Sequence, residues 1–496
     1  MMTNAEMFNL IKIPWIPVVC RDGKKRKIAP WQMAAHDVLR PNWPRPDMNI
    51  ACYELLIGMI FLADPPINRG DWSGRQNPDP EHLKKKLEPF TGAFNLLGDG
   101  HRFLQDTDPL EGEEEKPVDM LFIDSAAHKT IEDNKDLMVH RDRYQSLDLP
   151  TAAMALYTLQ AFAPSGGSGH RTSMRGGGPM TTLVNPGSGL WDLIWANVPC
   201  RNNPDPESDF ECLPWTRATR FSDREHNNQK TFPPGYAPGE DNRKFGVEAF
   251  FGMPRRIRLI GDNGYIKGVR QRKYGTNYAG WKHPLSPHRR NNAKEEWSPK
   301  HPGPGRFGYR NWLGIVMRES RSNTSELSLS LTEWSENRGG DSDVVVAGWA
   351  MDNMKPVNFI FSTQPLLKFQ SQEIDQEDII VKMIGAAEET NRILRKALRE
   401  SISIEKELLN VESDSFFAET EDRFLNHVQK LKGGGDPRYI WMKDLQQKAI
   451  ARFDALTEHS FIHMDINLID KIIKKRKSLL GFLFRKLPKL MDMSDA

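Results

Sequence analysis

A chain of 496 residues with 38% apolar and 27% charged residues is long enough for more than one domain and can bury a sizeable core without cross-links. Its formal net charge of +2 excludes nucleic-acid binding driven by overall charge and leaves local basic patches to do it. The 4 cysteines lie far apart and form no C-x-x-C pair, so we expect buried thiols in a reducing, cytoplasmic compartment.

The sequence begins without the pattern of a signal peptide, and we expect no membrane partner. Residues 8–30 predict a hairpin whose turn is the Arg-Asp-Gly sequence. Pro14 and Pro17 favour a sheet edge for its first strand, because proline cannot donate to the ladder. The longest apolar run, residues 50–63, contains Glu54 and is too short to span a bilayer, so it predicts a buried helix.

The middle of the chain alternates short elements with long irregular stretches. Residues 65–120 are rich in proline, glycine and charge, and their acidic run EGEEEK predicts a solvated loop. A short helix over residues 150–162 precedes the glycine-rich stretch APSGGSGHRTSMRGGGPMTT (residues 163–182), after which a short strand is expected. Residues 186–245 predict loops, and residues 250–275 predict a hairpin around an Asp-Asn-Gly turn.

The pattern changes after about residue 366, where apolar residues recur at helical spacing in four runs. The GGGDP sequence at residues 433–437 separates the second run from the third, since glycine ends helices and proline suits a first turn. Four such helices with mostly short links predict an antiparallel bundle. The expected fold class is α+β, with a large mixed α/β N-terminal domain over residues 1–365 and a C-terminal four-helix bundle over residues 366–496.

Common catalytic motifs are missing from the sequence, which contains no G-x-S-x-G, H-E-x-x-H or G-x-x-x-x-G-K-[ST]. His283 and His288 would suit a metal pair, but no cysteine or carboxylate joins them nearby, and surface or loop histidines are the favoured interpretation. We therefore expect no enzyme, no cofactor and no metal. Two other classes stay open from the residues alone: a stand-alone metal-dependent nuclease, and a purely architectural subunit of an RNA–protein complex.

The glycine-rich stretch supports two interpretations. Glycine lets the backbone approach a bulky partner closely, and backbone N–H groups in such loops form concavities for anions. Arg171 and Arg175 would then add contacts to backbone phosphates. The alternative is a flexible connector between a helix and a strand.

Several fragments, in order along the chain, resemble one family, the large subunit of the type I-E CRISPR Cascade surveillance complex, or CasA family. They are FNLIKIPWIPV, APSGGSGHRTSMRGGGPMTTLV, FFGMPRRIRL, WKHPLSP, GWAMDNMKP and the helical tail. The resemblance implies a non-catalytic subunit that joins crRNA-containing Cascade subunits and recognises the protospacer-adjacent motif (PAM) of double-stranded target DNA. It also implies that the subunit helps to open the duplex and to recruit a separate helicase–nuclease.

The resemblance further implies which residues contact the motif. The glycine loop of the family falls on Ser165, Gly166, Gly167, Ser168 and Gly169. Its lysine finger falls on the VRQRKYG segment, at Arg272 or its neighbours Arg270 and Lys273. From the residues alone, this basic run could equally be a solvated strand face.

The same resemblance implies functional roles for two further segments. The wedge at the duplex fork falls on Asn353, which from the residues alone could instead cap a turn. The DNKDLMVHR loop implies contacts of Asn134 and His140 with the guide end or a neighbouring subunit. Some family members carry a cysteine-rich zinc site, but residues 255–280 contain no cysteine, so no zinc is expected.

Overall fold

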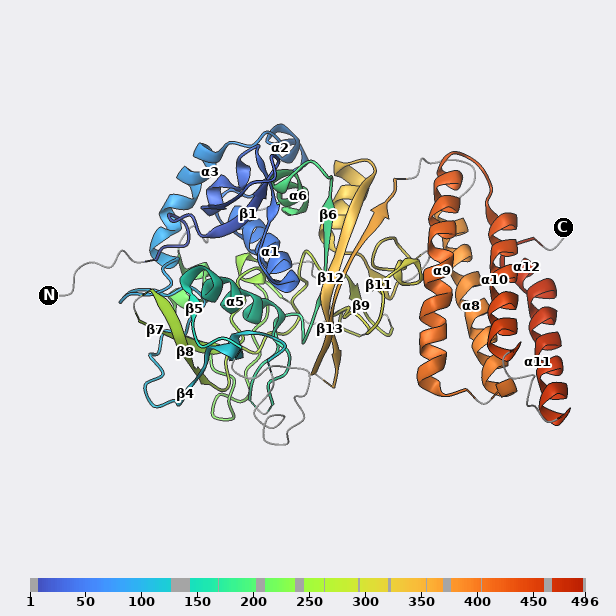
Figure 1. Cartoon of the computed structure of the whole chain (residues 1–496). Coiled ribbons are helices and arrows are strands. Elements are labelled where there is room, and N and C mark those ends of the chain that lie inside the picture. The colour runs from blue at the N-terminus through green and yellow to red at the C-terminus, as the bar shows by residue number, and fades with distance from the viewer. Residues whose placement is uncertain are drawn as a thin grey trace. The chain divides into compact units, whose positions relative to one another are not determined.

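The structure is a computed structural model that describes residues 8–125, 143–167, 169–201, 210–236, 245–262, 264–292, 295–319, 323–353, 355–368, 376–402, 404–458 and 466–493. The chain forms two compact units (Figure 1). Unit 1 comprises Met1–Pro304 and Asn323–Leu367, and unit 2 comprises Gly305–Ser322 and Lys368–Ala496. The mixed helix and sheet content with C-terminal helices confirms the expected fold class.

The first sheet of unit 1 contains the hairpin predicted near the N-terminus. It consists of β1 (Ile16–Cys20), β2 (Lys25–Ile28) and β3 (Val38–Pro41). The strand order β2-β1-β3 makes β1 central, so the prediction of an edge strand was wrong. The sheet accommodates Pro17 because it lies at the start of the strand, one residue before the β3 pairing begins, and its carbonyl accepts the Asn42 N–H.

Short helices surround the core of unit 1: α1 (Pro46–Ala63), α2 (Arg69–Gly74), α3 (Pro80–Leu87), α5 (Leu149–Phe162), α6 (Leu190–Asn197) and α7 (Leu329–Glu333). The predicted α1 and α5 are confirmed, and they pack against each other. Among the described helices, α1 alone is long and apolar enough to cross a membrane, and 78% of its apolar window is buried inside the unit. A core helix of a folded domain passes that same test.

Three of these helices were not predicted from the sequence, and one of them, α6, lies where loops were expected. The α2 and α3 helices lie within residues 65–120, and α6 lies within residues 186–245. Long-range aromatic packing joins two of them, since Trp72 of α2 stacks on Trp195 of α6 with ring centroids 6.5 Å apart. Local propensity carries no signal for such a contact, because short helices gain most of their stability from tertiary packing.

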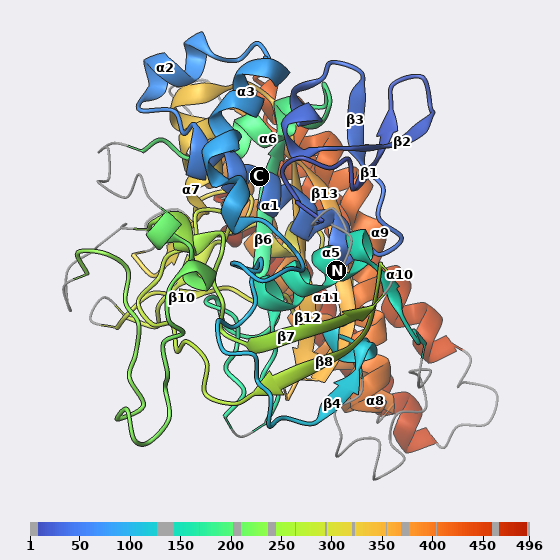
Figure 2. The same cartoon turned by 90° about the vertical axis from the view of Figure 1, so that its left-hand side faces the viewer.

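A second sheet contains the predicted Asp-Asn-Gly hairpin. Its strands are β4 (Glu115–Pro117), β5 (Leu147–Asp148), β7 (Arg256–Asp262) and β8 (Tyr265–Arg272). The β8 strand pairs antiparallel with β7 along its length and also with β4 (Figure 2). It pairs antiparallel with β5 as well. The pairing with β4 draws the acidic segment before that strand toward the basic end of β8.

The third sheet carries the longest strands of the described chain. Its order is β13-β12-β6, with β6 (Met180–Asn185), β12 (Ser342–Asp352) and β13 (Lys355–Leu366) (Figure 1). The β6 strand confirms the strand expected after the glycine-rich stretch. A small separate sheet contains β9 (His288–Arg289), β10 (Ser298–Pro299) and β11 (Ser325–Glu326).

Unit 2 contains the four predicted helices, α8 (Gln376–Ile402), α9 (Lys406–Lys432), α10 (Arg438–Glu458) and α11 (Ile466–Arg485), followed by the short α12 (Leu487–Leu490). The sequence analysis assigned residues 305–322 to the N-terminal domain, whereas this segment belongs to unit 2. Its Tyr309 is fully buried and stacks on Phe424 of α9 with centroids 4.3 Å apart. Aromatic residues from a segment distant in the sequence therefore form part of the core of unit 2.

Candidate nucleic-acid interface

The glycine loop (residues 165–169) connects α5 to the rest of the glycine-rich stretch in unit 1. Gly166 and Gly167 are exposed, and Gly167 and Gly169 have positive φ angles of 89° and 82°. A β-carbon on Gly169 would lie 3.0 Å from the β-carbon of Lys273 and from the Tyr274 ring. The Tyr274 N–H donates to the Gly169 carbonyl at 2.7 Å. The fold therefore places the loop directly against the segment predicted to carry the finger.

The downstream part of the same stretch contacts the β12–β13 hairpin. Gly178 has a positive φ of 66°, and a β-carbon there would overlap the carbonyl oxygen of Trp349 and the side chain of Met351. Asn353 lies two residues beyond Met351, at the exposed tip of the hairpin, with φ of 47°. Its amide donates to the Asp352 carboxylate at 3.2 Å. The glycine-rich stretch thus contacts both the finger segment and the hairpin that bears Asn353.

The three basic candidates at the end of β8 have different surroundings. Arg272 donates to Glu113 at 2.7 Å and to Asp108 at 2.6 Å, so two carboxylates already hold it. Arg270 lies opposite Glu115 of β4 in the register. Lys273 is exposed and forms no ion pair within the described part of the chain. Of the three, Lys273 is the cation most available to a partner.

The acidic run predicted as a solvated loop therefore has a structural role. Asp108 and Glu113 lie in the segment before β4, and both hold Arg272. The Leu110 N–H and then the Arg272 guanidinium lower the pKa of Asp108. No local pattern predicts this clamp, because its two sides are more than 150 residues apart.

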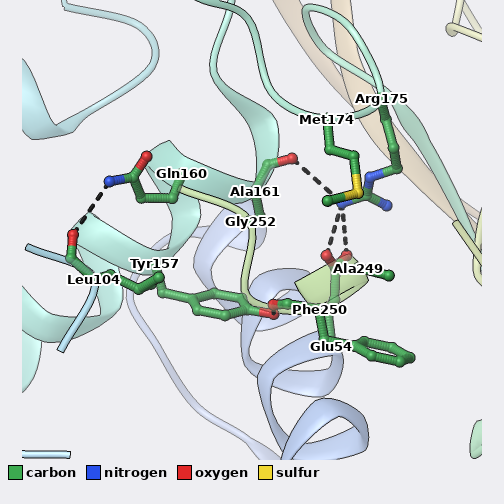
Figure 3. Close-up of a pocket in the computed structure, with 10 residues that line it drawn as sticks. All are labelled: Glu54, Leu104, Tyr157, Gln160, Ala161, Met174, Arg175, Ala249, Phe250 and Gly252. Carbon is green, nitrogen blue, oxygen red and sulfur yellow. Dashed lines mark hydrogen bonds and ion pairs between the residues drawn. The ribbon is translucent and has the colours of Figure 1, made fainter. Parts of the chain in front are cut away.

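The structure contradicts the phosphate role predicted for Arg175. This side chain is only 2% exposed, and its Nη2 donates to both carboxylate oxygens of Glu54 on α1, at 2.7 and 2.9 Å (Figure 3). An arginine paired inside the core cannot reach a phosphate at the surface. Arg171 is half-buried and donates through Nε to the Ser222 hydroxyl at 2.8 Å, so it too has a partner within the fold.

Glu54, Arg175 and His283 form a buried charged cluster. The Nε2 of His283 lies 3.4 Å from Glu54, and both side chains are 1% exposed. Burial alone would raise the pKa of Glu54, but the charge of Arg175, together with the interaction with His283, outweighs it and the pKa is lowered. The adjoining cavity, drawn in Figure 3, measures about 10 Å³, no more than one water molecule needs. The cluster therefore joins α1 to the glycine-rich stretch and has no room for a ligand.

His283 and His288 were expected on the surface or in loops; His283 does lie in a loop and His288 lies in β9, but both side chains are buried. They are 1% and 3% exposed. Burial lowers the pKa of His283 to about 4 and that of His288 to about 3, so both are neutral at pH 7. Among the residues that the structure describes, no group of three or more His, Cys, Asp or Glu side chains is arranged to hold a metal ion.

Arg255 is a basic residue of this region that the sequence analysis missed. It precedes β7, is 6% exposed, and donates from Nη2 to the Pro164 carbonyl at the start of the glycine loop. A β-carbon on Gly166 would lie 2.6 Å from its Nη1. Its position in the FFGMPRRIRL segment suggested only a strand, since nothing local indicates a contact 91 residues away. Asn134, His140 and Ser168 lie outside the described residues.

Unit 2 carries a second basic surface, a groove of about 420 Å³ between the end of α8 and the start of α9. Its lining residues are Arg392, Arg395, Lys396, Arg399, Ile404, Lys406 and Leu409. Glu389 pairs with Arg392, and Arg395 donates to the Leu409 carbonyl at 3.0 Å. The remaining cations face the groove without an ion pair in the described chain.

The family model of CRISPR-associated protein Cse1 matches residues 9–452. The chain therefore belongs to the Cse1 family of CRISPR-associated proteins, which confirms the resemblance to the large subunit of the type I-E Cascade complex. A CasA/Cse1 protein of Thermus thermophilus is 29% identical over 173 residues, and the match spans 33% of this chain and 33% of that relative.

Solved structures show the same fold. The crystal structure of Thermobifida fusca Cse1 is 18% identical, covers 100% of both chains and has a TM-score of 0.76. A chain of a CRISPR RNA-guided surveillance complex is 15% identical and has a TM-score of 0.69, with 95% of this chain and 99% of that chain covered. At these identities the likeness establishes the fold alone.

Proposed function

We propose that this chain is the non-catalytic large subunit of a crRNA-guided Cascade complex and that unit 1 recognises the PAM of double-stranded target DNA. Family membership and a fold shared with a chain of an RNA-guided surveillance complex support the assembly. The DNA-binding part of the proposal rests on the contact between the glycine loop and Lys273. The same glycine-rich stretch also contacts the hairpin that bears Asn353.

The chemistry of these elements suits the minor groove. That groove presents mostly acceptors, and its pattern is degenerate, so a reader needs donors and close backbone approach. Lys273 and the Asn353 amide supply donors, while exposed Gly166 and Gly167 let the backbone approach. A degenerate pattern also implies that several related motifs are accepted.

Asn353 would act as the wedge that helps to open the duplex. The tip of a long antiparallel hairpin is a stiff place from which to insert a side chain, and Asn353 is exposed there. Unstacking one base step costs a few kcal/mol, which new contacts and guide pairing offset. The same subunit would then help to recruit the separate helicase–nuclease once the duplex is open.

The test uses the complex assembled with crRNA and the full chain. Lys273→Ala should weaken binding to a target duplex by roughly 5–150-fold, about 1–3 kcal/mol, and change the ranking of PAM sequences, because a base-edge donor is lost. Arg272→Ala should have a smaller effect, since Asp108 and Glu113 already hold that side chain. Lys24→Ala, on the exposed β1–β2 turn, is the matched control. Unchanged affinity and unchanged PAM ranking for Lys273→Ala would remove the site assignment.

The proposal gives the chain itself no catalytic step. Incubation of the purified chain with duplex DNA and Mg²⁺ or Mn²⁺ should leave the DNA intact. Robust metal-dependent cleavage that survives repurification would favour a nuclease instead.

A further inference from the structure

The β13 strand forms a free edge of the third sheet. The sheet order β13-β12-β6 leaves β13 with one neighbouring strand, β12, along its 12 residues (Figure 1). An edge strand presents N–H and C=O groups on its outer side, which are a template for another extended chain. Folded proteins usually cover or interrupt such an edge, so an open edge of this length points to a partner.

The hydrogen bonds of β6 determine which backbone groups of β13 point outward. The Thr182 N–H donates to the Leu285 carbonyl at 2.8 Å, so Thr182 faces away from β12. Residues directly opposite each other in an antiparallel pair either both bond across it or both face away. Val346, opposite Thr182, therefore faces β13, where it is paired with Ser362. Ser362 thus bonds inward, to β12.

Three residues of β13 point their backbone groups away from the sheet. Because the direction alternates along a strand, the outward residues on either side of Ser362 are Phe359, Phe361 and Thr363. Each of them carries one N–H donor and one C=O acceptor. Within the described part of the chain, none of these groups has a hydrogen-bond partner. The edge therefore offers a regular row of donors and acceptors.

The side chains along this edge are apolar and uncharged. Val357 and Phe361, which lie on one face of the strand, are 55% and 56% exposed. The sequence VNFIFST at residues 357–363 contains no charge and consists largely of residues that favour strands. Charged residues and prolines normally protect an open edge, but in β13 they lie only near its two ends, among them Pro356 and Pro365.

These features select an extended polypeptide as the occupant of the edge. A nucleic acid binds through cations, and residues 357–363 carry none. The hydrocarbon of a lipid surface has no donors and acceptors with which to continue a ladder. An extended segment supplies N–H and C=O groups at the right spacing. At every second position it also supplies a side chain that can cover Val357 and Phe361.

We propose that β13 is a docking edge for an extended, uncharged segment of a neighbouring protein subunit, which adds to the third sheet as a further strand. The proposal rests on the proposed function, namely that the chain works within a multisubunit complex. The backbone of the added segment bonds to Phe359, Phe361 and Thr363, and its apolar side chains pack on Val357 and Phe361. Since the same hairpin bears Asn353, the added strand also holds the hairpin in place.

The first experiment compares hydrogen exchange of the full chain alone and in the complex assembled with crRNA, resolved residue by residue. In the chain alone, the outward N–H groups, those of Phe359, Phe361 and Thr363, should exchange at least about tenfold faster than the inward ones. The inward groups are those of Ile360 and Ser362, which bond to β12. In the complex, the outward groups should slow to the rate of the inward ones. Rates that stay unchanged on assembly would overturn the proposal.

The second experiment measures how tightly the chain binds the remaining crRNA-containing subunits. Phe361→Lys should weaken binding roughly 10–100-fold, because it removes an apolar contact and places a charge on the docking edge. Thr363→Pro should weaken it roughly 2–10-fold, because it removes one outward N–H and leaves the ladder with β12 intact. Ile67→Lys, at another exposed apolar residue of unit 1, is the matched control and should bind like the wild type. Thermal melting checks that each variant is folded, and if one is not, hydrogen exchange of the wild type decides.

The outcomes separate this inference from the proposed function. If the wild-type chain does not join the crRNA-containing subunits, the proposed function fails. If it joins them and folded Phe361→Lys binds with wild-type affinity, the docking edge is wrong while the proposed function stands. Protection of the outward groups that grows with the concentration of the isolated chain would make a second copy the occupant. Protection that appears only with target DNA would make DNA the occupant. Either result would overturn the proposal.

Discussion

Arg175, predicted from its charge to bind phosphate, instead forms a buried ion pair with Glu54 that stabilises the fold. Arg175 lies in a glycine-rich basic segment, where exposure is the natural expectation. Glu54 lies in the middle of an apolar helix, where a carboxylate has a high desolvation cost. Arg175 Nη2 lies 2.7 Å from Glu54 Oε1, and each charge compensates the desolvation cost of the other.

We predict that Glu54→Gln lowers the free energy of unfolding of unit 1 by about 3–5 kcal/mol, because it leaves the Arg175 charge buried and unpaired. Denaturant titration measures the change. The double variant Glu54→Gln with Arg175→Met should recover most of the loss, since neither charge then remains. A loss under about 1 kcal/mol for the single change would mean that Arg175 finds other compensation. Glu81→Gln, on exposed α3, is the control.

At the scale of elements, the turn of the β12–β13 hairpin allows the backbone conformation at Asn353 to be tested separately from the function of its side chain. Asn353 has a φ of 47°, a left-handed conformation that glycine and asparagine tolerate and β-branched residues do not. The turn therefore constrains which substitutions test the side chain without disturbing the strands.

Asn353→Gly should keep the melting temperature within about 1 °C, because glycine suits the left-handed turn. The same change should weaken target binding in the assembled complex, since the amide is lost. Asn353→Val should in addition destabilise unit 1 by about 1–2 kcal/mol through backbone strain. Thermal melting and duplex binding, measured side by side, check both statements. Wild-type binding by Asn353→Gly would exclude a wedge made by this amide.

At the scale of the whole molecule, buried neutral histidines couple the stability of unit 1 to pH. The pKa values of His283 and His288 are lowered to about 4 and about 3, below the value of about 6.5 in an unfolded chain. The unfolded state therefore binds more protons as the pH falls below about 6.5. The stability contributed by these residues is complete above that pH and is lost progressively toward pH 4 and below.

Lowering the pH from 6.5 to 5 should therefore reduce the contribution of these two histidines to the free energy of unfolding by about 3–4 kcal/mol, which is up to 1.4 kcal/mol per pH unit for each histidine. Thermal or denaturant unfolding across this range measures the slope. His288→Gln should lower the slope by up to half, since one protonation site is removed. A stability that stays level down to pH 5 would show that these histidines are not neutral and buried.

Local sequence patterns alone determine many of the secondary-structure elements of this protein. Helical periodicity predicted the four long helices, and turn sequences predicted both hairpins, because these features depend on residues close together in the chain. Ordered fragments indicated the family, and the glycine loop and the basic segment after β8 were both singled out.

Tertiary structure alone decided which charges are available. Arg175 is buried against Glu54 and Arg272 is clamped by two carboxylates, whereas Lys273 remains exposed and Arg255 lies beneath the glycine loop. All four are basic residues in basic surroundings, and no local pattern distinguishes them. The reason is physical: the availability of a charge depends on burial and on counter-ions that lie 121 to 164 residues away along the chain, and only the folded chain sets these.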